Sequence, residues 1–272
     1  MVPENPDSSQ AISTTAPATA PLGGSPPCSG VRTPPIVVRA TGRRNPITCR
    51  GMGVTERAGS RRPRQEQVEG TRLRIILAAE RLFAEHGVFS VSNRQVSEAA
   101  GQGNNAAVNY HFGTKADLVR AIIRRHAEPM EAIRARLLAR YRGSTEPRDW
   151  VTCTVRPYTD HLTSLGTPSR YARFAAQVIT EPGLRELAAP EFAGASGLRA
   201  ITAALHVCLP GLRPAVWTER DDMAHTLIVH LCARRERLLP DDAAGAARVW
   251  ARTATGLIDA IEGLYRAPMS PQ

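Results

Sequence analysis

Lysine is almost absent from this chain of 272 residues, because Lys115 is the only one and arginine supplies the rest of the 35 basic side chains. An arginine bias that accompanies abundant alanine is typical of a GC-rich coding sequence, so the arginines alone do not indicate phosphate binding. The net charge of +10 is nevertheless compatible with a polyanionic partner.

Paired cysteines and long apolar runs are also absent. The five cysteines are odd in number and form no CxxC pair, which argues against a disulfide framework or a zinc ribbon. The longest apolar runs, such as residues 226–233, are much shorter than the roughly 20 residues that span a bilayer, and no apolar leader segment opens the chain. We therefore expect a cytoplasmic protein with reduced thiols and no membrane partner.

The sequence offers no recognisable catalytic motif. Residues 194–197 read GASG, which is not the GxSxG nucleophile elbow, and neither a Walker loop nor a dinucleotide fingerprint occurs. His225 and His230 are five residues apart, so a helix would direct them to different sides rather than to one metal ion. We expect a protein that is not an enzyme and has no metal or cofactor.

The N-terminal segment, residues 1–69, is rich in proline, serine, threonine, glycine and alanine, and we expect it to be a disordered basic tail. It carries nine arginines against five acidic residues, and residues 70–126 carry eight basic side chains against four acidic ones. The cluster of Arg57, Arg61, Arg62 and Arg64 fits a flexible arm for the minor groove of DNA, or equally a solvated tail. Met1 and Met52 are both candidates for the start of translation.

Residues 92–115 form the most informative segment. Ser92 is a good N-cap for a helix over residues 93–100, and Gly101 and Gly103 end that helix. A second short helix should run from residue 104 or 105 to about residue 112, with small side chains on one side and polar, nearly uncharged side chains on the other. Two such helices across a tight turn suit the major groove of DNA, although any three-helix bundle with glycine turns would share the pattern.

The motif that follows is more specific. Gly113 ends the second helix, and Thr114 with Asp117 forms a capping box that opens the next one. Residues 71–87, residues 92–100 and above all NYHFGTKADL at residues 109–118 resemble the N-terminal domain of the TetR/AcrR family of transcriptional regulators. The turn at residues 101–105 is one residue longer than in most members of that family, which leaves open which side chain of residues 104–107 meets which base.

The resemblance implies a set of DNA contacts. Phosphate contacts would come from Tyr110, His111, Lys115 and the helix N-terminus at Thr114. Asparagine can form two hydrogen bonds with adenine and alanine can touch a thymine methyl group. The stretch that faces base edges comprises Asn104, Asn105, Ala107 and Asn109, with Arg94 and Gln95 on the preceding helix as secondary candidates.

The rest of the pattern predicts an all-α chain. The first helix, residues 71–86, should bury Leu73, Ile76, Leu77, Ala79 and Phe83 on one face. The next helix begins after Thr114, and Pro129 should end or kink it before a further helix reaches Tyr141. More helices are expected at residues 148–165, 169–180, 198–209, 214–238 and 241–265. We therefore expect a helix-turn-helix DNA-binding domain at residues 70–116 and a larger helical domain for ligand binding and dimerisation at residues 117–272.

In the family, the last two long helices pair with their copies in a second subunit as a four-helix bundle. The apolar stripe for such a bundle would be Leu227, Ile228, Leu231, Val249, Ala254, Leu257, Ile258 and Ile261. Packing within one chain would require the same stripe, so both interpretations stay open. A homodimer would recognise a palindromic operator in double-stranded DNA.

The C-terminal helices also contain polar and aromatic residues that suit a pocket for an unidentified small-molecule effector. Arg173, Phe174 and Gln177 lie within about one helical turn, and with Tyr158 they would combine an apolar wall with a carboxylate-binding group. The function expected is a sequence-specific regulator, most often a repressor, that a ligand releases from DNA. The alternatives are a ligand-independent architectural DNA-binding protein and an enzyme with a degenerate helix-turn-helix appendage.

Overall fold

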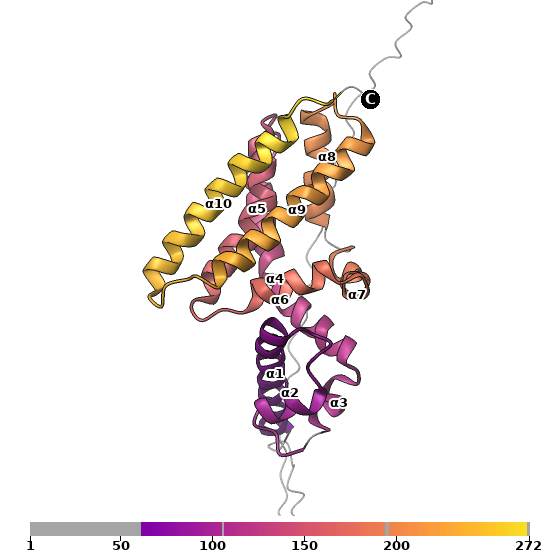
Figure 1. Ribbon diagram of the computed structural model, residues 1–272, viewed down its shortest axis with the longest axis vertical. Coiled ribbons are helices and arrows are strands. Elements are labelled where there is room, and N and C mark those ends of the chain that lie inside the picture. Colours follow the sequence, from indigo (N-terminus) through magenta and orange to yellow (C-terminus); the bar gives the residue numbers. More distant parts are fainter. Residues whose placement is uncertain (1–60, 105, 194–195, 271–272) are drawn as a thin grey trace, which may run out of the picture. The chain divides into compact units, whose positions relative to one another are not determined.

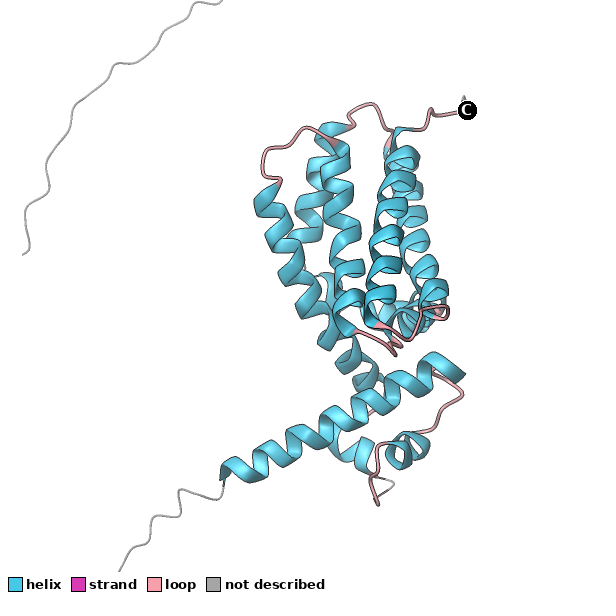
Figure 2. Ribbon diagram, turned by 90° about the vertical axis from the view of Figure 1, so that its left-hand side faces the viewer, coloured by secondary structure: helices cyan, strands magenta, loops and turns pink. Residues whose placement is uncertain are grey.

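The computed structural model describes residues 61–104, 106–193 and 196–270, and every regular element in these ranges is a helix (Figures 1 and 2). The all-α fold class is therefore confirmed. The helices are α1 (Arg61–His86), α2 (Asn93–Ala99), α3 (Ala107–Phe112), α4 (Lys115–Arg140), α5 (Pro147–Leu165), α6 (Tyr171–Thr180), α7 (Pro182–Ala193), α8 (Ser196–Cys208), α9 (Pro214–Glu236) and α10 (Ala243–Arg266).

Helix α1 differs from the prediction at its start and in its buried face. It begins at Arg61 rather than at residue 71, so residues 61–69 of the expected tail are helical, and the remainder of that tail lies outside the described residues. The buried face is formed by Ile75, Ala79 and Phe83, which repeat every four residues. Leu73 and Leu77 share a different face and are 44% and 46% exposed.

Both predicted caps are confirmed. The Ser92 backbone N–H donates to Gln95 Oε1 at 2.8 Å, and the Gln95 backbone N–H donates to Ser92 Oγ at 3.2 Å. Thr114 and Asp117 form the same reciprocal box at the start of α4. Between them, α3 begins only at Ala107, because the Asn104 side chain accepts the backbone N–H of Ala106 at 2.9 Å and closes a turn there.

The prolines in two helices misled the sequence prediction. Helix α4 continues through Pro129 as one element of 26 residues, so Pro129 does not end the helix and the separate helix expected after it was wrong. A proline inside a helix removes one hydrogen bond, and the packing of a long helix can offset that loss. Helix α7 was not predicted. Pro182 is its first residue, where a missing N–H costs nothing, and Pro190 lies inside it.

The C-terminal helices form a bundle in which α5 packs against α4, α8 and α10, and α6 packs against α1, α7 and α9. The apolar stripe expected at a subunit interface serves mainly this core. Ile228, Ala254, Leu257, Ile258 and Ile261 are each no more than 5% exposed within the single chain. For these five residues the intrachain interpretation is correct, and a partner subunit could reach only their more exposed neighbours.

Three of the five cysteines fall in the described residues, and Cys153, Cys208 and Cys232 are all free thiols. Among the described helices none is long and apolar enough to cross a membrane.

Candidate nucleic-acid interface and internal cavity

Helix α3 has one buried and one exposed face. Val108 is fully buried and Phe112 is 9% exposed, and together they anchor the helix in the core of α1–α4. Asn109 is exposed and Tyr110 is 79% exposed. Ala107, expected to face a base, is only 7% exposed, so its methyl group belongs to the core and is not available to a thymine.

Asn109 links the two helices of the motif. Its Oδ1 accepts a hydrogen bond from Asn93 Nδ2 at 2.8 Å, which joins α3 to the first residue of α2. The oxygen is therefore occupied, and the amide N–H groups of Asn109 remain as donors on an exposed side chain. Such donors suit an acceptor such as N7 or O6 of a purine.

Lys115 forms hydrogen bonds with the protein backbone, which the sequence did not indicate. Its Nζ donates to the carbonyl of Val88 at 3.1 Å and to that of Val91 at 2.5 Å, so it ties the loop between α1 and α2 to the start of α4. Partial burial lowers the pKa of this amine. Thr114, beside it, is exposed, and its hydroxyl donates to Asp117 Oδ2 at 2.6 Å.

The backbone around His111 is held by an arginine that the sequence did not single out. Arg72 donates from Nη1 to the His111 carbonyl, and its guanidinium carbon lies 4.4 Å from the centre of the Phe112 ring. Desolvation and the positive charge of Arg72 lower the pKa of the His111 imidazole. Arg72 is 39 residues from His111 in sequence, so no local pattern could have revealed this contact.

The remaining predicted DNA contacts lie on or near α2. Arg94 is exposed and pairs with Glu98 at 2.8 Å, and the Gln95 oxygen is engaged in the cap of Ser92. Asn104 is exposed, although its oxygen holds the turn before α3. Asn105 lies outside the described residues.

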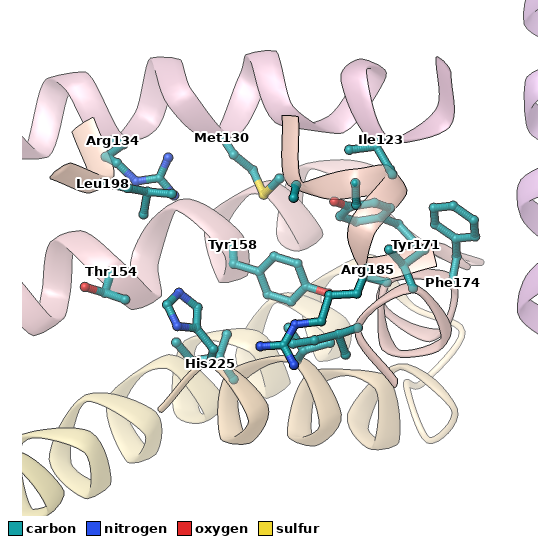
Figure 3. Close-up of a pocket in the computed structure, with 17 residues that line it drawn as sticks. Ile123, Met130, Arg134, Thr154, Tyr158, Tyr171, Phe174, Arg185, Leu198 and His225 are labelled. Atoms are coloured by element: carbon teal, nitrogen blue, oxygen red, sulfur yellow. The ribbon is translucent and has the colours of Figure 1, made fainter. Parts of the chain in front are cut away.

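A cavity of about 350 Å³ lies among the C-terminal helices (Figure 3). It is mostly apolar and has a few polar groups, as small-molecule sites do. The lining residues are Ile123, Met130, Arg134, Thr154, Tyr158, Tyr171, Phe174, Ala175, Val178, Ile179, Arg185, Ala188, Ala189, Leu198, His225, Ile228 and Val229.

Two of the four predicted ligand-binding residues, Tyr158 and Phe174, line this cavity. Arg173 and Gln177 do not. Arg173 turns to α9, where its Nε lies 3.3 Å from Glu236 Oε2, so the carboxylate it binds comes from the protein itself. Gln177 approaches the end of α1, with its side-chain oxygen 3.4 Å from where a Cβ on Gly87 would lie.

Two buried polar groups in the cavity wall have no hydrogen-bond partner among the described residues: the Tyr158 hydroxyl and Arg134 Nε. Burial raises the pKa of the Tyr158 phenol, which keeps its proton at neutral pH. Each charged side chain that lines the cavity has an acidic partner outside the lining. Arg134 Nη1 donates to Glu131, Arg185 lies 3.0 Å from Asp222, and His225 Nδ1 lies 3.5 Å from Asp221.

A buried polar chain connects this region to α1. Glu80 Oε2 lies 2.9 Å from His126 Nε2, and His126 Nδ1 lies 2.8 Å from His161 Nε2. The Tyr171 ring, which lines the cavity, stacks on the His126 ring with 3.7 Å between centroids. Four helices therefore meet at this cluster, which neither spacing nor periodicity in the sequence could reveal.

The comparisons with known proteins agree with this geometry. Residues 75–122 match the family model described as "Bacterial regulatory proteins, tetR family". No curated protein matched the chain significantly.

Several solved structures are similar to this chain at low sequence identity. NalD, the secondary repressor of the MexAB-OprM multidrug efflux pump in Pseudomonas aeruginosa, is 26% identical, over 69% of this chain and 97% of NalD, with a TM-score of 0.44. The multidrug binding protein EbrR, complexed with ethidium, is 23% identical over 67% of this chain and 97% of EbrR, with a TM-score of 0.37. Salmonella enterica GusR is 21% identical over 72% and 96% of the two chains, with a TM-score of 0.33. Because these TM-scores are below 0.5, the solved structures carry no argument about function, and the similarity to the family lies in residues 75–122.

Proposed function

We propose that the chain, whose residues 75–122 match the model of the tetR family of bacterial regulatory proteins, is a member of that family and a homodimeric repressor that a small molecule releases from a palindromic operator. DNA binding and transcriptional regulation follow from the family. The proposal adds four points: that the protein represses rather than activates, that a ligand controls it, that it forms a dimer, and which residues carry each role. The boundary between the DNA-binding domain and the ligand-binding domain would lie near residue 116, at the start of α4, so that this helix connects the two.

The observation that carries the proposal is the geometry of α3. Two capping boxes hold its neighbours α2 and α4, Val108 and Phe112 anchor it, and Asn109 and Tyr110 are left exposed. A short helix that presents neutral hydrogen-bonding side chains from a rigid base suits the major groove. We assign base reading to Asn109, with Asn104, Asn105 and Gln95 as further candidates.

We assign phosphate contacts to a second set of residues. Tyr110 and Thr114 are exposed, Arg94 precedes them in the sequence and His111 lies between them. Hydroxyl groups and cations at such positions fix the register of a protein on the DNA backbone. Lys115 would act chiefly by fixing the loop that supports α2, since its amine is bonded to two carbonyls.

Dimerisation is proposed through the exposed faces of α9 and α10. On α10 this face comprises Val249, Gly256, Ala260 and Gly263, which repeat at helical spacing and are more exposed than the buried stripe beside them. On α9 it includes Met223 at 53% and Leu227 at 36% exposure. Small side chains on one helix and large apolar ones on the other allow two such pairs to pack closely.

The cavity favours a ligand-controlled regulator over an architectural DNA-binding protein, because a protein without an effector has no need of unpartnered buried polar groups in an apolar chamber. Its connection to α1 through Tyr171, His126 and Glu80 offers a route from the ligand to the DNA-binding helices.

The test is a nuclease footprint on the DNA immediately upstream of the protein's own gene. We expect a protected palindrome whose half-sites lie about 10 base pairs, or a multiple of that, apart. The Tyr110→Ala variant should lose the footprint while keeping its thermal stability, because Tyr110 contributes little to the core. A matched control is Tyr141→Ala, on the C-terminal side of α4, which should bind as the wild type does. Binding that is equal on all sequences would support the architectural alternative.

A further inference from the structure

The polar groups of the cavity specify the kind of molecule that would occupy it. We propose that the cavity binds an organic anion, an apolar molecule with a carboxylate or sulfonate group, and that Arg134 holds the anionic group. This proposal rests on the proposed ligand control and adds the chemical class of the ligand.

The body of the ligand follows from the size and the apolar lining. About 350 Å³ suits a compound of two or three fused or linked rings. Ile123, Phe174 and Val178 are at most 7% exposed and form a fixed apolar wall. In Figure 3, Phe174, Tyr171 and Ile123 lie toward one end, Arg134 and Thr154 toward the other, and Tyr158 between them.

The head group follows from one unsatisfied donor. Arg134 Nε is buried and can only donate a hydrogen bond. A buried donor without an acceptor is costly, and a ligand oxygen beside Arg134 would relieve it. In Figure 3 the hydroxyl of Tyr158, the other unsatisfied donor of the lining, points away from Arg134 and so would meet a different part of the ligand. A hydrogen bond from a guanidinium to an anionic oxygen is stronger than one to a neutral oxygen.

The sign of the charge follows from the rest of the lining. Arg134, Arg185 and His225 face the cavity, and none of its described lining residues is acidic. Their partners Glu131, Asp222 and Asp221 contact them from outside that lining. The hydrogen bond to Asp221 raises the pKa of His225, which favours its cationic form. An organic cation would meet positive charge with no acidic group among the lining residues to compensate it.

Two fluorescent probes of the same ring system test the proposal: 1-anilinonaphthalene-8-sulfonate, which is anionic, and N-phenyl-1-naphthylamine, which lacks the sulfonate. Each is titrated into the wild-type full chain and into Arg134→Met, Tyr158→Phe and Arg136→Met. Arg136 is exposed on the same helix as Arg134, so the last variant makes the same charge change away from the cavity.

We expect Arg134→Met to weaken binding of the sulfonate probe by roughly ten- to a hundredfold, and to change binding of the neutral probe by less than about twofold. Tyr158→Phe should change the binding of the two probes by the same factor, because its unpartnered hydroxyl points away from Arg134 and does not meet the sulfonate. Arg136→Met should change neither probe.

Sulfonate binding that is unaffected by Arg134→Met would overturn the proposal, and so would equal losses for the two probes in that variant or the failure of either probe to bind. If Arg134→Met does not fold, Arg134→Gln decides in its place. Operator binding is measured on the same preparations. Intact operator binding together with any of these negative results would reject the organic anion and leave the DNA-binding function standing.

Discussion

His126 Nε2 on α4 lies 2.9 Å from Glu80 Oε2 on α1, and both side chains are buried. The pair joins the helix that begins at the DNA-binding motif to the helix that supports it. The Tyr171 ring, which also lines the cavity, covers the His126 ring. A ligand that displaces Tyr171 would therefore act on a contact between the two helices.

His126→Phe should lower the free energy of unfolding by about 3 kcal/mol, because it leaves one partner of a buried pair without the other. The ring remains to stack on Tyr171, so packing is largely kept. The double variant Glu80→Leu with His126→Phe should recover part of the loss, since the Glu80 carboxylate no longer remains unpaired, whereas His161 Nε2 still lacks the partner that His126 supplied. Urea denaturation followed by circular dichroism measures all three variants. A double variant whose loss equals the sum of the two single losses would show that the pair is not coupled.

Acid should destabilise the protein partly through His161. Desolvation, and then the nearby His126 and Arg125, lower the pKa of His161 to about 4. The unfolded chain has the ordinary value near 6.5, so this stability is present above pH 6.5 and is lost as the pH falls toward 4. The difference of about 2.5 between the two pKa values of His161 corresponds to about 3 kcal/mol in the free energy of unfolding.

The variant His161→Gln isolates that contribution. Between pH 7 and 4.5 the wild type should lose about 2–3 kcal/mol more than this variant, as measured by denaturant unfolding at each pH. His86→Gln removes an exposed histidine and should follow the wild type. Parallel curves for His161→Gln and the wild type would refute the assignment to His161.

Lys115→Ala distinguishes two roles for the only lysine. If its amine chiefly supports the Val88 and Val91 carbonyls, the variant should lose about 1–2 kcal/mol of stability. Operator affinity should then fall while the slope of log Kd against log salt stays unchanged. A slope reduced by about one unit, with stability unaltered, would instead identify the phosphate contact that the sequence motif suggests.

Two substitutions on α10 distinguish residues of a subunit interface from residues of the core of one chain. Ala260→Glu, on the exposed face, should give a folded monomer that no longer binds the operator tightly, because a single recognition helix makes too few contacts. Leu257→Glu should instead unfold the chain, since Leu257 is fully buried within it. Ala139→Glu, on an exposed face of α4, is the control. Light scattering that finds a dimer for a folded Ala260→Glu protein would place the interface elsewhere.

Local signals in the sequence were sufficient for the motif and its caps. Ser92 with Gln95 and Thr114 with Asp117 are each three residues apart, and such short-range chemistry is legible without a structure. The family motif lies within the same segment. The all-α class followed from the periodicity of the later helices.

Contacts over long sequence separations could not be predicted. Arg173 was assigned to a ligand because nothing marked Glu236, 63 residues later, as its partner. Lys115 was assigned to DNA because its two carbonyl acceptors are 27 and 24 residues away. Leu257 and Ile261 repeat at the spacing that suits both a subunit interface and a core, and periodicity cannot distinguish the two.

The account's central claim, that α3 reads bases through Asn109, is tested most directly by measuring affinity for a set of operator variants with wild type and Asn109→Ala. The account predicts that the wild type discriminates at one position of each half-site by about 1–3 kcal/mol and that Asn109→Ala loses this preference there while keeping it elsewhere. Identical preference profiles for the two proteins would contradict it.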